Sequence, residues 1–273
     1  MNFTITQLIA VLALNLILSF TNGGTELYFR LAIMLNGISG LLILIPMVFL
    51  YRRDRRIRIS CGILKQQDRS LFAGEIILLL LFGAALSFYG NYLMNMLSIL
   101  LDPSDYFERM AMLESGYSLG ELVFWIGLVG PLTEEGIFRW LIYLRLRDYF
   151  PDRQNPADEG AERSFKRRVW IPVLLSSLLF GAYHGSLLQF LYAGLLGFCF
   201  ALILEWTGNI WSTVLLHIGA NILSLLVSEW LANQPLSRQN AISAYLLVTM
   251  LAVLVYGFRY FRGMGRDHAA RLE

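Results

Sequence analysis

The amino-acid sequence predicts an all-α membrane protein of about eight transmembrane helices. Of its 273 residues, 56% are hydrophobic and 15% are charged, whereas a soluble domain has about 45 to 50% apolar and about 25% charged residues. The mean hydropathy is +0.56. Apolar runs of about 20 residues, the length that crosses a hydrocarbon core of about 30 Å, recur along the chain. We therefore expect a single integral membrane domain over residues 1–273 and no soluble catalytic module.

The apolar runs define eight expected spans: residues 5–20, 27–51, 71–101, 119–144, 169–185, 187–206, 210–231 and 242–261. The first is short, and the segment MNFTITQ before and within it lacks the basic residues of a secretory signal, so we expect a retained helix. Only Gly185 and Ser186 separate the fifth span from the sixth, so one of the two could be tilted or re-entrant. The acidic stretch 102–114 predicts a short interfacial helix on the outer side.

Basic residues predict which ends of the spans face the cytoplasm. Eighteen of the 22 Lys and Arg residues lie at 52–69, at 145–168 and from 259 to the C-terminus. Short cytoplasmic loops retain basic residues, so eight spans place both termini in the cytoplasm. The clusters could instead bind lipid headgroups or nucleic acid, but a topology signal explains all three together. Cys61 falls in a basic loop and Cys199 in an apolar span, so no disulfide framework is expected.

Three charged residues fall near the middle of the fourth span, in the segment TEEGIFR at 133–139. Each costs about 2.5 to 3.5 kcal/mol at the centre of a transmembrane helix, so a functional role is expected. Glu135 and Arg139 are four residues apart, which predicts an ion pair on one helix face. Glu134 lies about 100° round the helix without that partner and suits a general base acting on water. The alternative is a buried polar cluster that locks helices together.

Two further pairs of residues with i, i+4 spacing carry the histidines of the membrane spans. Phe180 and His184 share one face of the fifth span, and His217 and Asn221 share one face of the seventh. Alone, a His or Asn in a membrane helix more often joins two helices, with a contribution of about 0.6 kcal/mol. Together with the glutamate pair, these residues predict one shared site. The third histidine, His268, lies in the basic C-terminal tail and is expected to be solvated.

The three motifs, EExxxR at 134–139, FxxxH at 180–184 and HxxxN at 217–221, together resemble the CPBP membrane proteases. This family includes the type II CAAX prenyl endopeptidases and the Abi proteins. The resemblance extends over about residues 123–223, whereas the first three spans match only in hydrophobicity. It implies eight helices that enclose an intramembrane catalytic cavity, with a catalytic core at about 119–232. It also implies an endopeptidase that acts on a membrane-associated protein or peptide, with a prenylated CAAX-type substrate as one option.

The resemblance assigns a role to each motif residue: Glu134 activates water with help from His184, His217 and Asn221 form the oxyanion hole, and Glu135, Arg139 and Phe180 support them. Glu134, His184 and His217 could instead hold a zinc ion, the only cofactor these residues suggest. Because an HExxH helix is absent, we favour a glutamate-activated water without metal. Trp140 departs from the pattern, since a small residue, usually Gly, follows the arginine in relatives. This departure puts the shape of the substrate pocket in question.

Two other classes of function fit the intramembrane charges. A proton-coupled transporter would line its pathway with Glu, His and Arg, but no inverted repeat or matching pair of broken helices stands out. A non-catalytic scaffold or regulator would use the same residues to bind a membrane partner. The expected surroundings are membrane lipid, in the plasma membrane of a prokaryote, with no nucleic-acid partner. The sequence predicts no oligomeric state.

Overall fold

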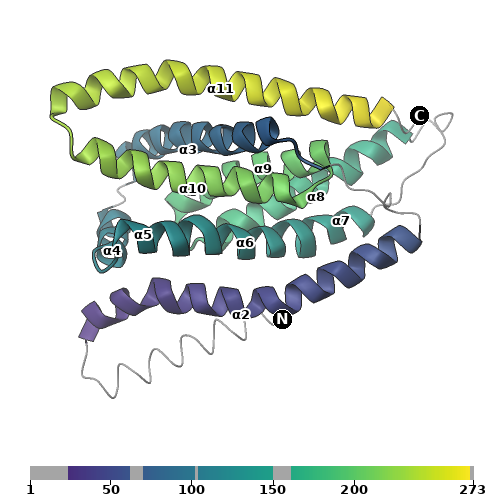
Figure 1. The fold of residues 1–273 in the computed structure, drawn as a ribbon, viewed down its shortest axis with the longest axis horizontal. Coiled ribbons are helices and arrows are strands. Elements are labelled where there is room, and N and C mark those ends of the chain that lie inside the picture. The colour runs from purple at the N-terminus through teal and green to yellow at the C-terminus, as the bar shows by residue number, and fades with distance from the viewer. Residues whose placement is uncertain (1–23, 62–69, 102–103, 150–160, 271–273) are drawn as a thin grey trace.

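A computed structural model describes residues 24–61, 70–101, 104–149 and 161–270 (Figure 1). These residues form helices and short connections without strands, so the predicted all-α fold class is confirmed. The expected first span, residues 5–20, lies outside the described residues. The seven later spans are all helical, and several helices continue past their apolar runs.

The helices follow one another in this order: α2 Gly24–Ser60, α3 Ala73–Leu101, α4 Ser104–Glu114, α5 Leu119–Leu122, η1 Val123–Val129, α6 Gly130–Glu135, η2 Gly136–Tyr143, α7 Leu144–Tyr149, α8 Ala161–Tyr183, α9 Leu187–Thr207, α10 Ile210–Ala232 and α11 Leu236–Ala270. The segments α5 to α7 continue directly into one another and form a single helical rod, in which η1 and η2 are π-helical. The short helix predicted in the acidic stretch is present as α4, and its position at the membrane interface stays a prediction.

Five of the described helices are long and apolar enough to cross a membrane, and they lie in α2, α3, α9, α10 and α11. The part of α8 from Arg168 to Tyr183 is apolar but shorter. The rod from α5 to α7 carries the three charges that the sequence places in its fourth span. The chain is therefore an integral membrane protein whose most polar helical rod lies inside the bundle.

The helices run nearly parallel to the long axis of the molecule in an up-and-down arrangement (Figure 1). α3 packs against α10, α8 against α9, and α11 against both α3 and α9. α2 forms the opposite edge and packs mainly on α4 and on the rod. The rod thus lies between α2 and α10, where its side chains can reach both helices.

Glycines bring α3 and α10 into close contact. A Cβ atom on Gly83 would overlap the backbone carbonyl of Leu216, and a Cβ atom on Gly219 would overlap the backbone of Leu80. Small residues of this kind let membrane helices approach closely and gain packing energy. This contact fixes α10, and with it the histidine of the seventh span, against the centre of the bundle.

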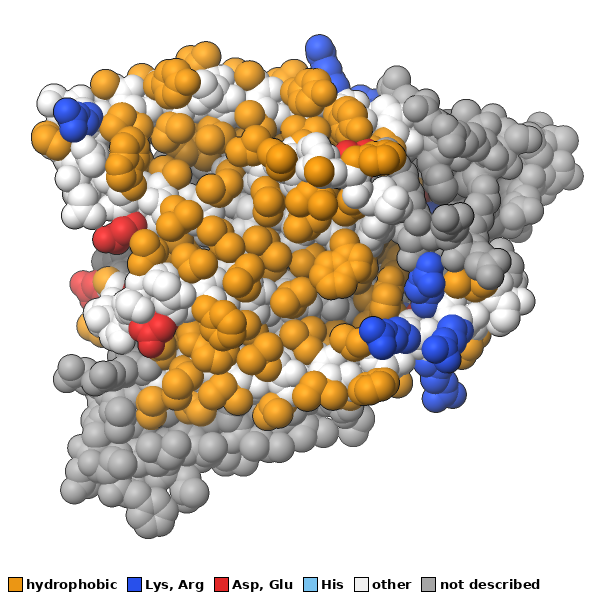
Figure 2. Space-filling view, in the orientation of Figure 1, with side chains coloured by type: hydrophobic (Ala, Val, Ile, Leu, Met, Phe, Trp, Pro, Cys, Tyr) orange, Lys and Arg blue, Asp and Glu red, His pale blue; other side chains and the backbone are white. Residues whose placement is uncertain are grey.

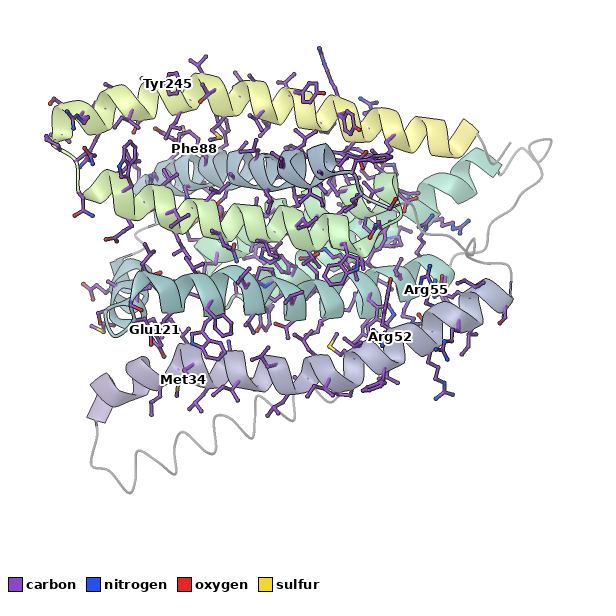
Figure 3. The ribbon with its side chains drawn as sticks, viewed as in Figure 1. Met34, Arg52, Arg55, Phe88, Glu121 and Tyr245 are labelled. Atoms are coloured by element: carbon purple, nitrogen blue, oxygen red, sulfur yellow. The ribbon has the colours of Figure 1, made fainter. Side chains whose placement is uncertain are left out.

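The two ends of the molecule carry opposite charge. Hydrophobic side chains cover the middle of the face in Figure 2, most of the visible Lys and Arg lie at the right-hand end, and most of the visible Asp and Glu lie at the left-hand end. Figure 3 labels Arg52 and Arg55 of α2 at the basic end and Glu121 at the acidic end. The basic residues at the end of α2, in α7 and near the C-terminal end of α11 therefore lie at one end, as a common topology signal requires.

Candidate active site

One cavity of about 620 Å³ is lined by residues from most helices of the bundle. The side chains around it include five of the predicted site residues: Glu134, Phe180, His184, His217 and Asn221. They come from α6, from the end of α8 and from α10, so residues 87 positions apart in sequence meet. The cavity has the size of a typical ligand pocket, with a largely apolar wall and a few polar groups. Glu135 and Arg139 lie behind this wall and are fully buried.

Two π-helical segments flank the short α-helix that carries the glutamates. η1 ends at Val129, α6 holds both glutamates, and η2 begins at Gly136. π-helical turns are rare and often occur at functional sites. The carbonyl oxygen of Ile126, in η1, accepts a hydrogen bond of 3.0 Å from the side-chain amide of Asn221. The irregular turn therefore faces α10 and holds the amide at the cavity wall.

The predicted i, i+4 ion pair is present. Arg139 Nε lies 3.0 Å from Glu135 Oε2, and neither side chain is exposed. Arg139 Nη2 also donates a hydrogen bond of 3.0 Å to the carbonyl oxygen of Gly197 in α9. The guanidinium carbon lies 4.7 Å from the ring centroid of Phe180 and 5.3 Å from that of Phe200. Cation–π contacts of this kind stabilise a charge that has been removed from water.

The imidazole of His217 lies between the two glutamates. Its Nδ1 donates to Glu135 Oε1 across 2.9 Å, and its Nε2 lies 3.8 Å from Glu134 Oε2. The Glu134 side chain retains 20% of its exposure, whereas that of Glu135 has none. Neighbouring carboxylates thus occupy different environments, one open to the cavity and one enclosed by charged partners. The contact between Glu135 and His217 was not predicted, because no local pattern relates residues 82 positions apart.

His184 lies just beyond the end of its helix rather than inside it. We expected the fifth span to reach residue 185, but α8 ends at Tyr183 and Gly185 adopts a left-handed φ of +79°. The Nδ1 atom of His184 lies 2.8 Å from the carbonyl oxygen of Phe180. Because a carbonyl oxygen only accepts, Nδ1 carries the hydrogen and the Nε2 lone pair is left for the cavity.

The proposed zinc ligands do not fit a metal site as they stand. Among the residues that the structure describes, no group of three or more His, Cys, Asp and Glu side chains is placed to hold a metal ion. Glu134 and His217 are close to each other, and the hydrogen bonds of Nδ1 to Phe180 and to Glu135 leave Nε2 as the nitrogen of each histidine that could bind a metal. A zinc site needs at least three converging protein ligands.

The sequence raised the question of whether Trp140 alters the shape of the substrate pocket. Trp140 is not among the residues that line the cavity. It is 3% exposed and packs edge-on against Tyr51 of α2, with ring centroids 5.6 Å apart. Its indole nitrogen donates a hydrogen bond of 3.0 Å to Asp54 Oδ2. The side chain therefore joins η2 to α2, and the residues that line the cavity do not include it.

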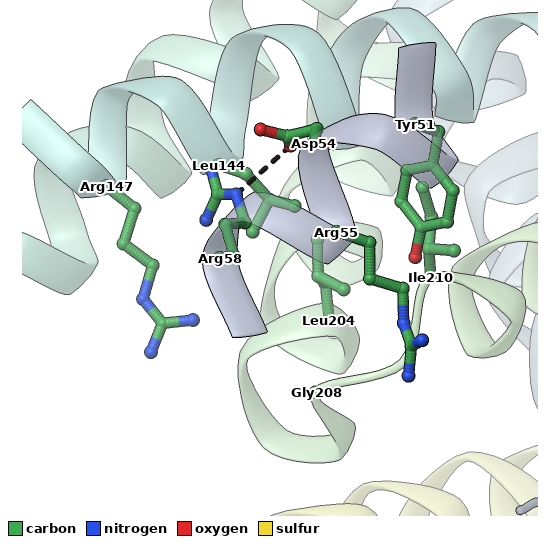
Figure 4. A pocket seen from close by; sticks show the side chains of 9 residues that line it. All are labelled: Tyr51, Asp54, Arg55, Arg58, Leu144, Arg147, Leu204, Gly208 and Ile210. Atoms are coloured by element: carbon green, nitrogen blue, oxygen red, sulfur yellow. Dashed lines mark hydrogen bonds and ion pairs between the residues drawn. The ribbon is translucent and has the colours of Figure 1, made fainter. Parts of the chain in front are cut away.

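A second, much smaller cavity of about 50 Å³ lies at the basic end (Figure 4). Its charged wall is built from ion pairs, since Arg58 Nε lies 3.1 Å from Asp54 and its guanidinium also contacts Asp148 of α7. Arg145 adds a pair with Asp54 at 2.7 Å. These ion pairs join α2 to the rod, and the arginines and aspartates in them neutralise one another's charge. We assign them to the packing of the basic end, which sequence reasoning missed because the partners are far apart in the chain.

A known family matches the part of the chain that contains these residues. Residues 119–223 match the family model described as Rce1-like, type II CAAX prenyl endopeptidase Rce1-like. The match runs from the start of the rod into α10 and includes every residue of the polar cluster described above. It confirms the resemblance that the three motifs predicted. Searches of curated proteins and of solved structures found no match.

Breaking the buried pair of Glu135 and Arg139 should destabilise the fold more than breaking the partly exposed pair of Arg145 and Asp54. Arg139→Gln leaves the carboxylate of Glu135 buried without its cation, which should lower the free energy of unfolding by about 3 to 5 kcal/mol. Arg145→Gln, in the same rod, removes an arginine whose side chain is 45% exposed, and exposed pairs contribute about 0 to 1 kcal/mol. Thermal unfolding of the purified variants in detergent measures the difference. Equal melting temperatures for the two variants would contradict this assignment.

Proposed function

We propose that the protein is an intramembrane endopeptidase, on the premise that residues 119–223 form an Rce1-like domain. The observation that carries the proposal is one cavity that brings together groups able to activate water and to stabilise an oxyanion: Glu134, His184, His217 and Asn221. The substrate would be a membrane-associated protein or peptide, of which a prenylated CAAX-type protein is one option. The catalytic core would comprise about residues 119–232, in the plasma membrane of a prokaryote.

Glu134 acts as the general base in the proposed reaction. Its carboxylate lines the cavity and is partly exposed, so it can hold a water molecule. The free Nε2 of His184 provides a second acceptor for the same water. The water oxygen attacks the carbonyl carbon of the peptide bond while its proton moves to the base. The proton then passes to the leaving amine as the C–N bond breaks, which regenerates the base.

Asn221 and His217 stabilise the oxyanion of the tetrahedral intermediate. One amide hydrogen of Asn221 is used by Ile126, and the second is available to the cavity. His217 can donate from Nε2 only if that atom also carries a hydrogen, because its Nδ1 hydrogen is already given to Glu135. The donor form is therefore the imidazolium, which lies between the carboxylates of Glu134 and Glu135. Donors fixed before the reaction need no rearrangement as charge develops.

A transport pathway would require a second conformation of this bundle. A transporter must open its site alternately to both sides of the membrane. Behind the cavity lie the Glu135–Arg139 pair and Tyr143, all without exposure. A transporter would have to open these packed side chains, whereas the proposed hydrolysis needs no such opening.

Replacing the proposed base should abolish cleavage. Glu134→Gln keeps the shape of the side chain but cannot accept a proton, so peptide termini produced by the wild type should disappear. The measurement is quantitative mass spectrometry of new peptide termini in membranes from cells that express each form. Glu229→Gln is the matched control, because Glu229 is exposed and its carboxylate contacts Asn233.

An unchanged set of termini in Glu134→Gln would refute the assignment of the base. A variant that loses cleavage but keeps the cellular phenotype would show that the phenotype comes from a scaffold. Ion-dependent flux through purified protein in vesicles, without cleavage, would instead establish a transporter.

Removing the oxyanion amide should slow the reaction without unfolding the protein. Asn221→Ala should reduce kcat by about two to three orders of magnitude, the usual effect of one lost oxyanion donor. Asn91→Ala is the control, because its amide also makes a single hydrogen bond between helices, 3.1 Å to Ser224, away from the lining of the cavity. Steady-state kinetics on a substrate found by the mass spectrometry measures both variants. Equal kcat values for Asn91→Ala and Asn221→Ala would contradict the role.

The purified enzyme should cleave after treatment with a chelator. The described His, Cys, Asp and Glu side chains do not converge on a metal position, and the proposed base needs none. Elemental analysis before and after chelation, together with the rate of cleavage, measures metal dependence. Stoichiometric zinc whose removal abolishes cleavage, and whose return restores it, would overturn the proposed mechanism.

A further inference from the structure

The cavity occupies only one half of the bundle along the membrane axis. α2 begins at the acidic end and reaches the basic end with Arg52–Arg58, and Asn36 lines the cavity from its first half. The rod contributes Trp125 to Glu134, whereas its basic residues Arg145 and Arg147 follow more than ten residues later. The lining of the cavity therefore starts at the depth of Glu134 and extends away from the basic end.

The interfacial helix lies at the acidic end of this cavity. Met110 and Leu113 of α4 belong to the lining, while Glu108 of the same helix is exposed. α4 stands at the left-hand end in Figure 1, beside the start of α2 and the start of the rod. The hydroxyl of Tyr117 accepts a hydrogen bond of 3.1 Å from the backbone of Met34, which ties the segment after α4 to α2. α4 and the segment after it thus form the wall of the cavity at the end opposite Arg52–Arg58.

The basic end of the bundle is closed by packed and paired side chains. Phe138 and Tyr143, on the rod beyond Glu135, are 5% and 0% exposed. Beyond them, the ion pairs of Arg58 with Asp54 and Asp148 join α2 to α7. No residue of this network lines the large cavity. The large cavity therefore lies on the acidic side of these packed side chains.

We propose that the cavity opens to the extracytoplasmic face, so that the enzyme cleaves a peptide segment exposed on that side. Short loops rich in Lys and Arg stay in the cytoplasm, which places the acidic end outside. None of the described residues that line the cavity is Lys or Arg, and Glu134 contributes an acidic group. The site accordingly accepts a segment that is uncharged or basic beside the scissile bond. The substrate part of this inference rests on the proposed protease function, whereas the sidedness does not.

A native cysteine, Cys61, can report from which side of the membrane the basic end is accessible. Cys61 is exposed directly after α2 at the basic end, and Cys199 is the second cysteine. Three variants are compared, each with a single cysteine. The first is Cys199→Ser, which keeps Cys61. In the other two, Ser replaces both native cysteines, and the single cysteine is introduced by Leu113→Cys or by Asn36→Cys in the lining of the cavity. A charged, membrane-impermeant maleimide is applied to intact cells and to opened membranes. Each variant must melt like the wild type in detergent, and two cavity positions keep the test valid when one fails.

In intact cells the maleimide should label Leu113→Cys and Asn36→Cys but not Cys61, and Cys61 should be labelled once the membranes are opened. Labelling of Cys61 and of the cavity positions from the same side would overturn the inference. The opposite pattern, in which Cys61 is labelled in intact cells and the two cavity cysteines react only after the membranes are opened, would overturn the extracytoplasmic assignment. Because labelling needs no catalysis, a wrong sidedness leaves the Glu134→Gln result intact, and a failed cleavage test leaves the labelling result intact.

Discussion

The buried ion pair of Glu135 and Arg139 is the constraint on which the site depends. A carboxylate and a guanidinium removed from water must find partners, and each finds one on another helix. Glu135 binds His217 of α10, and Arg139 binds the carbonyl oxygen of Gly197 in α9. A buried pair of this kind adds little stability compared with apolar packing, but losing one member is costly. Its value here is positional, because it fixes three helices and one imidazole relative to one another.

Two adjacent glutamates can serve different purposes because a helix turns by about 100° between them. Glu135 faces the interior of the bundle and has no exposure, whereas Glu134 faces the cavity and keeps 20%. The π-helical segments on both sides of α6 leave the rod irregular where this division occurs. One of them supplies the Ile126 carbonyl that holds Asn221. The rod therefore presents the proposed base to the cavity and holds the amide of α10 at the same cavity.

Sequence reasoning was strong where a rule is local and weak where partners come from distant segments. The apolar runs predicted the described helices because a lipid-facing backbone must bond within its own segment. The spacing of Glu135 and Arg139 predicted their pair for the same local reason. The contact of Glu135 with His217 depends on how α10 packs, and nothing in either segment encodes it. Gly185 did carry a signal, since a glycine commonly ends a helix in a left-handed conformation. Read that way, it would have placed the end of α8 before His184. Trp140 was wrongly related to the pocket because residue type alone does not give the face of an irregular helix.

In the proposed mechanism, Glu134 needs contact with water, whereas Glu135 stays buried among its partners. A cavity that reaches from one end to Glu134 brings solvent to the proposed base, while Phe180 covers Arg139 at 4.7 Å. Behind that ring the effective dielectric constant is low, which strengthens the interactions of Glu135 with its two partners. A passage through the whole bundle would hydrate this cluster, weaken its hold on His217 and let the imidazole turn. The partly exposed carboxylate of Glu134 and the buried ion pair behind it are thus two parts of the one mechanism that we propose.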